Sequence, residues 1–121
     1  MHGRFEAPLR WVTSALFLGM GVSHFVATDY FVGIMPPWLP WPRALVLFTG
    51  GCEIAGAAGL QIPRLRRAAG ACLIVLLFAV LPANVQEASA AGRATAWLRL
   101  PLQLVFVALV WSVALRRPGA A

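Results

Sequence analysis

The chain has little charge and no lysine. Only 12% of its 121 residues are charged and 60% are apolar, whereas an average soluble domain has about 25% charged and about 45–50% apolar residues. So small a domain has a large surface relative to its volume, and this number of charged side chains cannot cover that surface. The composition excludes a disordered tail and an ordinary water-soluble fold. It predicts one domain over residues 1–121 that is covered mostly by the lipid bilayer.

Motifs for common cofactors and for nucleic acid are also missing. Cys52 and Cys72 form no C-x-x-C pair, so a disulfide or a haem thioether has no support. Two histidines, His2 and His24, are too few for a zinc or bis-histidine haem site, and we predict no metal site. The arginines do not form the basic stripe mixed with polar and aromatic residues that is typical of nucleic-acid binding, so we predict no nucleic-acid partner.

The chain does contain four long apolar stretches, at about residues 9–27, 44–61, 68–85 and 97–115. Each approaches or reaches the ~17–25 residues that cross a bilayer as a helix. Backbone groups within lipid must be satisfied in a helix or a closed barrel, and the stretches lack the alternation of barrel strands. We therefore predict an all-α fold, an integral membrane four-helix bundle with four transmembrane helices.

The arginines are distributed unevenly between the two ends of this predicted bundle. Short loops on the cytoplasmic side of a membrane carry an excess of basic residues. Seven arginines fall beside the two termini and in the turn between the second and third stretches, against Arg43, Arg93 and Arg99 on the other side. We expect both termini to be cytoplasmic and the chain to cross the membrane several times. The proline-rich connection over residues 35–42 is expected to form a stiff cap on the outer side.

Six polar or ionisable residues lie within or at the ends of these stretches, where such groups are costly. They are His24 in the first stretch, Glu53 in the second, Asn84 and Glu87 at the outer end of the third, and Arg99 and Gln103 at the start of the fourth. The rise of a helix, about 1.5 Å per residue, places the second stretch's carboxyl near the midplane and the others in the outer half. We predict that the six side chains line a ligand-binding pocket open to the periplasmic side.

Helical spacing supports a shared inward face, because residues three or four apart lie on one side of a helix. This spacing relates Thr13, Phe17, Met20 and His24 in the first stretch, and Gln103, Phe106 and Val110 in the fourth. A row of small residues on the second stretch predicts close contact with a neighbouring helix. The row is Gly51, Ala55 and Gly59.

Each polar residue also has a structural interpretation. Glu87 and Arg99 would form a salt bridge between the third and fourth helices. Asn84 and Gln103 each follow a proline closely, and a side-chain amide there can compensate for the missing backbone N–H. The histidine and the midplane glutamate would then serve only in helix packing. The coincidence of all six toward one end favours the pocket.

Six short motifs occur in order along the chain. They are Gly21-x-x-His24-Phe25, Pro36-Pro37-Trp38-Leu39-Pro40, Thr49-Gly50-x-x-Glu53, Pro63-Arg64-x-Arg66-Arg67-Ala68-Ala69, Leu81-Pro82-Ala83-Asn84-Val85 and Arg99-Leu100-Pro101-Leu102-Gln103. Together they resemble the DoxX family of small four-helix bacterial membrane proteins, often grouped with MauE as redox-associated, over about residues 9–115. One departure is Leu81, where the family pattern leads us to expect phenylalanine before the proline.

The resemblance implies a four-helix, multi-pass protein of the bacterial cytoplasmic (inner) membrane with a connection to redox pathways. Members are linked to thiosulfate oxidation with quinone as acceptor, to oxidative-stress complexes and to methylamine dehydrogenase maturation. We therefore expect a redox-associated membrane subunit or a binder of a small lipophilic, quinone-like ligand. A quinone is the candidate cofactor and redox subunits are candidate partners, while an enzymatic activity stays open.

Two other classes of function stay open. A proton-coupled small-molecule transporter, like the small multidrug resistance proteins, also has four helices and one membrane carboxylate. Those proteins often insert in both orientations and carry the carboxylate in the first helix, whereas here the arginine bias predicts one orientation and Glu53 lies in the second stretch. A non-catalytic membrane scaffold subunit would use the polar residues only for packing.

Overall fold

The structure, a computed structural model, describes residues 3–91 and 97–116, and these residues form helices and turns without any strand. The elements are α1 (Gly3–Val26), α2 (Thr28–Gly33), α3 (Pro42–Leu60), α4 (Arg66–Ala79), α5 (Leu81–Ala91), α6 (Arg99–Val110) and the π-helical turn η2 (Trp111–Leu115). The all-α prediction is confirmed for this part of the chain. Two arginines used to predict the orientation, Arg93 and Arg117, lie outside the described residues.

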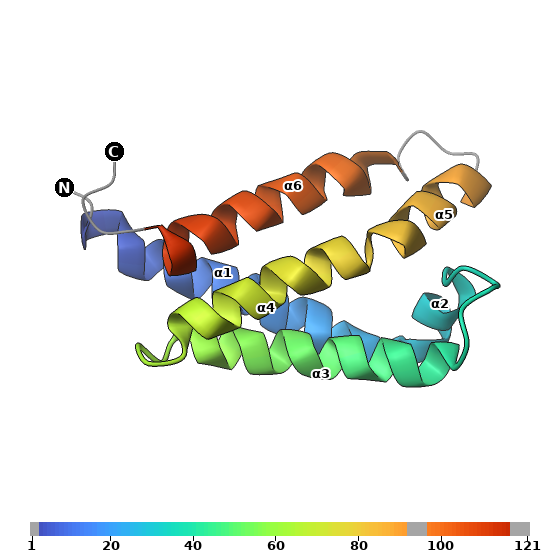
Figure 1. Cartoon of the computed structure of the whole chain (residues 1–121), viewed down its shortest axis with the longest axis horizontal. Coiled ribbons are helices and arrows are strands. Elements are labelled where there is room, and N and C mark those ends of the chain that lie inside the picture. Colours follow the sequence, from blue (N-terminus) through green and yellow to red (C-terminus); the bar gives the residue numbers. More distant parts are fainter. Residues whose placement is uncertain (1–2, 92–96, 117–121) are drawn as a thin grey trace.

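Four helical rods lie side by side and alternate in direction: α1, α3, α4 with α5, and α6 with η2 (Figure 1). α1 packs along α3, α3 packs on α4, and α4 packs on both α6 and η2. The start of α1, the turn between α3 and α4, and the end of η2 lie at one end of the bundle, and α2 lies at the other (Figure 1). We call the first the arginine end, because it holds Arg4, Arg10, Arg64, Arg66, Arg67 and Arg116, and the second the α2 end.

Three helical stretches in the described part of the chain are long and apolar enough to cross a membrane, Arg4–Val26, Pro42–Leu60 and Arg66–Ala90. The fourth predicted stretch forms a shorter apolar helix, Arg99–Leu115. The third helix was predicted to end near residue 85, but it continues to Ala91 after a break at Val80. Pro82 falls in the first turn of α5. N–H groups in a first turn have no partner within the helix, so a proline there costs no helical hydrogen bond and the helix can resume.

The connection between α1 and α3 contains a short helix that we did not predict, α2. The chain after it turns without forming a helix until Pro42, as its prolines require. Trp41, between two prolines, has a φ of 51° and is the only described residue other than glycine with a positive φ. A left-handed conformation at such a residue costs on the order of 1–3 kcal/mol.

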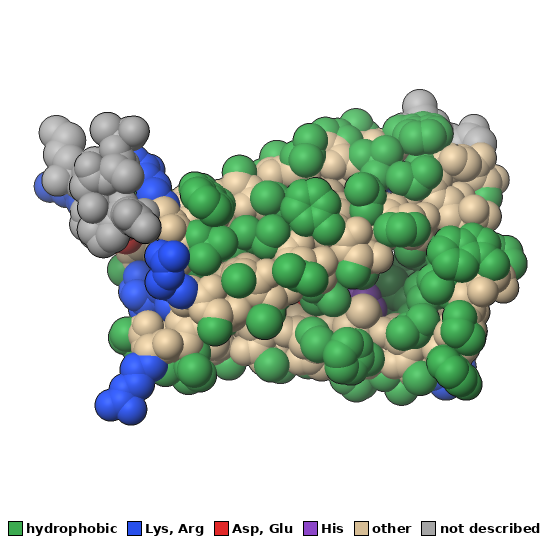
Figure 2. Space-filling view, viewed as in Figure 1, with side chains coloured by type: hydrophobic (Ala, Val, Ile, Leu, Met, Phe, Trp, Pro, Cys, Tyr) green, Lys and Arg blue, Asp and Glu red, His purple; other side chains and the backbone are tan. Residues whose placement is uncertain are grey.

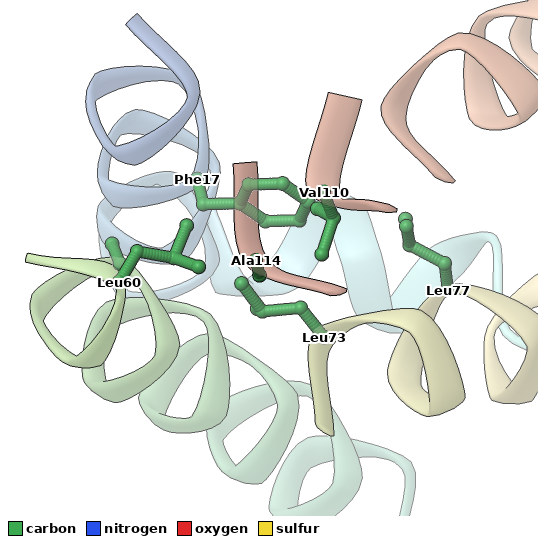
Figure 3. Close-up of a cluster of buried hydrophobic side chains, with 7 residues drawn as sticks. Phe17, Leu60, Leu73, Leu77, Val110 and Ala114 are labelled. Atoms are coloured by element: carbon green, nitrogen blue, oxygen red, sulfur yellow. The ribbon is translucent and has the colours of Figure 1, made fainter. Parts of the chain in front are cut away.

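The hydrophobic core lies between all four rods. Figure 3 shows its side chains pointing toward one another; they are Phe17, Leu60, Leu73, Leu77, Val110 and Ala114, and Ala57 completes the cluster. The ring of Phe17 is fully buried and meets the edge of Phe106 at 5.8 Å between centroids. The predicted inward faces of α1 and α6 are therefore confirmed.

The outer side of every rod is apolar and exposed (Figure 2). Leu18 on α1, Phe48 on α3, Val75 on α4 and Leu104 on α6 each expose about half or more of their side-chain surface. Monomeric soluble proteins rarely expose continuous apolar surface on this scale, and such surface marks contact with lipid or another apolar partner.

α1 and α3 approach closely at two glycines. A Cβ added to Gly50 would lie 2.6 Å from the Cβ of His24 and 3.0 Å from the carbonyl oxygen of Gly21. A Cβ added to Gly21 would lie 2.8 Å from the carbonyl oxygen of Gly50. Contacts below 3.0 Å do not occur for real Cβ atoms, so this helix crossing requires glycine on both sides.

The predicted row of Gly51, Ala55 and Gly59 is wrong as a contact face. A Cβ on Gly51 would meet nothing within 4 Å, and Ala55 is exposed. Gly59 does lie at a contact, 2.7 Å from the Cβ of Ala69 on α4. Residues four apart share a helix face only approximately. The close contacts of α3 are divided between α1, which meets Gly50, and α4, which meets Gly59.

The variants Gly50→Ala and Gly51→Ala test this helix crossing. The added methyl group of Gly50→Ala overlaps α1, so we expect a loss of about 1–3 kcal/mol in the free energy of unfolding. Gly51→Ala adds the same methyl group into open space and is expected to be neutral or slightly stabilising, because alanine favours helix. Denaturant unfolding of both proteins in detergent micelles measures the difference. Equal stability of the two variants would contradict the crossing.

Candidate functional site

The glycine crossing brings His24 of α1 next to Glu53 of α3. Each of these residues stands three positions after its glycine, so the same face that makes the close contact also carries the polar side chain. His24 Nδ1 lies 3.6 Å from Glu53 Oε2, and the two side chains are 13% and 8% exposed. Glu53 Oε2 is buried and has no hydrogen-bond partner within the described part of the chain. The pair therefore keeps an unused polar atom inside the bundle.

The ring nitrogens of His24 have different roles. Nδ1 lies 2.7 Å from the carbonyl oxygen of Met20, one turn earlier in α1. A carbonyl oxygen only accepts, so Nδ1 carries the hydrogen of this bond. The other nitrogen of the neutral ring, Nε2, is then a hydrogen-bond acceptor.

α2 covers His24 and connects it to α6. The ring of Phe31 stacks on the His24 ring, with 4.1 Å between centroids and an angle of 11° between planes. Phe31 also meets the edge of Tyr30 at 5.3 Å. The hydroxyl of Tyr30 accepts a hydrogen bond from Arg99 Nη2, and the guanidinium carbon of Arg99 lies 5.8 Å from the centroid of the same ring. Contacts thus run without a break from α3 to α6 through α2.

Arg99 also faces Glu87 across the α2 end. Its Nη1 lies 3.7 Å from Glu87 Oε2, and the glutamate side chain is 7% exposed. The structure therefore forms the salt bridge that the structural interpretation expects, and it joins α5 to α6. Because the same guanidinium binds Tyr30, one arginine holds two elements of the α2 end together.

Asn84 and Gln103 form a chain of hydrogen bonds that runs from α5 through α6 to α4. Asn84 Nδ2 donates to Gln103 Oε1 at 2.7 Å, and Gln103 Nε2 donates to the carbonyl oxygen of Leu77, in the turn before Pro82. Asn84 therefore reaches across to α6 and does not compensate for the proline in its own helix. These bonds link α4, α5 and α6 where the third rod is interrupted.

The six predicted site residues therefore form three pairs around the α2 end, and α2 connects two of these pairs. An open, apolar crevice of about 460 Å³ lies nearby, between the connection and the junction of α4 with α5. Its lining residues are Pro36, Trp38, Phe78, Leu81, Pro82, Val85, Gln86 and Ser89. Figure 2 shows a hollow in this face of the molecule, with histidine visible inside it. The lining does not include the six predicted residues.

The sequence pattern of one family, described as a domain of unknown function (DUF8561), matches residues 13–114. The chain belongs to the DUF8561 family. The matched region runs from α1 to η2 and includes all three polar pairs and α2. No curated protein and no solved structure matches the chain. The relation to the DoxX family therefore stays a prediction.

Two residues at the centre of this arrangement, Tyr30 and Phe31, were missed from the sequence. They stand between the first apolar stretch and the prolines, in a segment that we treated as a connection. One signal was present, because Tyr30 is the only tyrosine in the chain. Within the described residues, no group of three or more His, Cys, Asp or Glu side chains is arranged to hold a metal ion.

Removal of the Phe31 ring is expected to expose His24. The ring lies flat on the imidazole, so Phe31→Ala should raise the rate of His24 modification by diethyl pyrocarbonate several-fold. Phe48→Ala, which removes an exposed ring from the outer side of α3, is the control and should leave the rate unchanged. Peptide mass spectrometry separates His24 from His2. Equal rates in the two variants would show that α2 does not cover the histidine.

Proposed function

We propose that this chain is an integral protein of the bacterial inner membrane that binds a quinone-like lipophilic ligand at its α2 end. The apolar outer sides of all four rods support membrane insertion, because in water they would expose a continuous apolar surface. The shorter Arg99–Leu115 helix is then the fourth span, packed on α4. The arginine end faces the cytoplasm and the α2 end faces the periplasm.

The unpartnered carboxyl oxygen of Glu53 carries the ligand proposal. A buried polar atom without a partner costs free energy, and native structures retain few of them. Glu53 Oε2 lies in the bundle 3.6 Å from His24 and has no hydrogen-bond partner within the described residues. The carboxylate accepts a hydrogen bond from a ligand hydroxyl, and the protonated carboxyl donates one to a ligand carbonyl oxygen. A quinone carries such oxygens on an apolar body, and binding sites of this kind are apolar with a few polar groups.

The nearby crevice suits the apolar part of such a ligand. Its volume of about 460 Å³ falls within the range of about 300–1,000 Å³ that is common for small-molecule sites. Figure 2 shows a histidine within a hollow of the molecular surface. In this arrangement the ring of the ligand reaches His24 and Glu53, and its tail lies along Phe78 and Val85. The resemblance to the DoxX family supports a redox-associated role with partner subunits.

A scaffold subunit is the second candidate, and the pairing of the other polar residues favours it. Asn84 binds Gln103, and Arg99 faces Glu87, so these four side chains have a structural use without any ligand. His24 and Glu53 also face each other, at 3.6 Å, but Glu53 Oε2 makes no hydrogen bond within the described residues. The two functions therefore make different predictions for Glu53: its substitution weakens ligand binding if the protein is a ligand binder, whereas a scaffold subunit binds no ligand in the first place.

Titration with a short-chain quinone analogue tests the proposal. We expect the analogue to raise the unfolding temperature of the detergent-solubilised protein. Glu53→Gln keeps the shape of the side chain but removes its acid group, and we expect at least about a tenfold increase in Kd, the size of a lost hydrogen bond to an ionisable group. Glu6→Gln, at the opposite end of the molecule, should bind as the wild type does. No shift in the wild type, or an unchanged Kd in Glu53→Gln, would leave the scaffold function.

A further inference from the structure

The arginine end carries a strong positive charge that the ligand proposal does not use. Six described arginines lie there, and one acidic residue, Glu6, lies among them. Figure 2 shows the basic side chains gathered at this end of the bundle, beside the apolar belt. The position of these charges explains the orientation in the membrane but not why some of the arginines lie against the helices.

Two of the arginines, Arg10 and Arg66, are hydrogen-bonded to neighbouring residues at the end of α3, Gln61 and Leu60 respectively. Arg66 interacts electrostatically with Arg10, a like charge, and with Glu6, an opposite charge. Arg10 Nε is buried and has no hydrogen-bond partner among the residues that the structure describes. A buried guanidinium N–H of this kind normally binds an acceptor, and two adjacent arginines favour an anion between them.

The backbone and side chains around these arginines are held in place. Gln61 Nε2 donates to Ser14 Oγ at 2.6 Å and to the carbonyl oxygen of Arg10 at 3.2 Å, and Ser14 Oγ donates to the carbonyl oxygen of Ala57 at 2.9 Å. Arg66 Nε donates to the carbonyl oxygen of Leu60, at the end of α3, at 2.8 Å. Both arginines are therefore attached to the same end of α3.

The start of α4 adds a second attraction for an anion. Within the described residues, the first turn of α4 carries no acidic residue, and Leu65 before it makes no side-chain hydrogen bond to the turn. Arg66 and Arg67 occupy this turn, although the positive end of the helix dipole disfavours cations there. An anion bound beside this turn would offset both the dipole and the repulsion between the arginines.

Two tryptophans place this end at the level of lipid headgroups. Trp11 and Trp111 are 62% and 56% exposed, and each lies within five residues of an arginine of this end, Arg10 and Arg116 respectively. Tryptophan prefers the boundary between acyl chains and headgroups. The anion that is abundant at that level is the phosphodiester of an anionic phospholipid.

We infer that Arg10 and Arg66 bind the phosphate of an anionic phospholipid in the cytoplasmic leaflet. The inference rests on the membrane insertion proposed above and is independent of the quinone-like ligand. A phosphate accepts hydrogen bonds from the outer N–H groups of both guanidiniums. Its negative charge also stabilises the Arg10 guanidinium, whose buried Nε–H has no partner within the described residues.

Thermal unfolding in a zwitterionic detergent tests the inference by titration with phosphatidylglycerol, phosphatidylcholine or inorganic phosphate. We expect phosphatidylglycerol to stabilise the wild type at concentrations where the other two have no effect. Each of Arg10→Gln and Arg66→Gln should raise the half-saturating concentration about fivefold, which corresponds to the attraction of anionic lipid for one arginine. Arg43→Gln, which removes an exposed arginine from the α2 end, is the matched control and should titrate as the wild type does.

Three results would overturn the lipid site. Equal stabilisation by phosphatidylcholine would show that the headgroup charge is not recognised. Stabilisation by inorganic phosphate alone would assign the arginines to a soluble anion. A wild-type titration for both arginine variants would place the lipid elsewhere. Reconstitution into phosphatidylcholine vesicles distinguishes failure of the lipid site from failure of the membrane proposal. A protein that does not enter the vesicles contradicts both the membrane proposal and the lipid site. A protein that enters normally but gives any of the three results contradicts the lipid site alone.

Discussion

The contact between the backbones of Gly21 and Gly50 is the constraint on which the α2 end depends. It allows α1 and α3 to cross so closely that the residues one turn later, His24 and Glu53, face each other inside the bundle. The apolar surface of the other rods gives no comparable specificity, because lipid tails cover such a surface as well as another helix does. Close packing at small residues is what fixes the arrangement of these two helices.

The two ends of the bundle use polar groups differently. At the α2 end, buried side chains face one another in pairs, and Tyr30 and Phe31 of α2 connect them. At the arginine end, the guanidinium groups bind helix-end carbonyls, as Arg66 does at Leu60, and leave an N–H of Arg10 without a partner. The first arrangement suits a neutral ligand with hydrogen-bonding oxygens, and the second suits an anion.

Much of the fold could be predicted from the sequence, because apolar length and helical spacing depend only on local residues. The inward face through Phe17 and the similar depth of Asn84 and Gln103 followed from spacing and helix rise, whereas the hydrogen bond between these two amides did not. The role of α2 could not be predicted, since a helix of 6 residues has too little periodicity to detect. The contact face of α3 was also misjudged. Gly50 and Gly51 look equivalent in the sequence, and only the position of α1 distinguishes them.

A double-mutant cycle between His24 and Glu53 measures the central claim most directly. The unfolding free energies of the wild type, His24→Gln, Glu53→Gln and the double variant are compared in one detergent. Because the two side chains are buried and 3.6 Å apart, we predict a coupling energy of about 0.5 kcal/mol or more. Additive effects of the two substitutions, as for residues with no shared contact, would contradict the crossing of α1 and α3 and the site built on it.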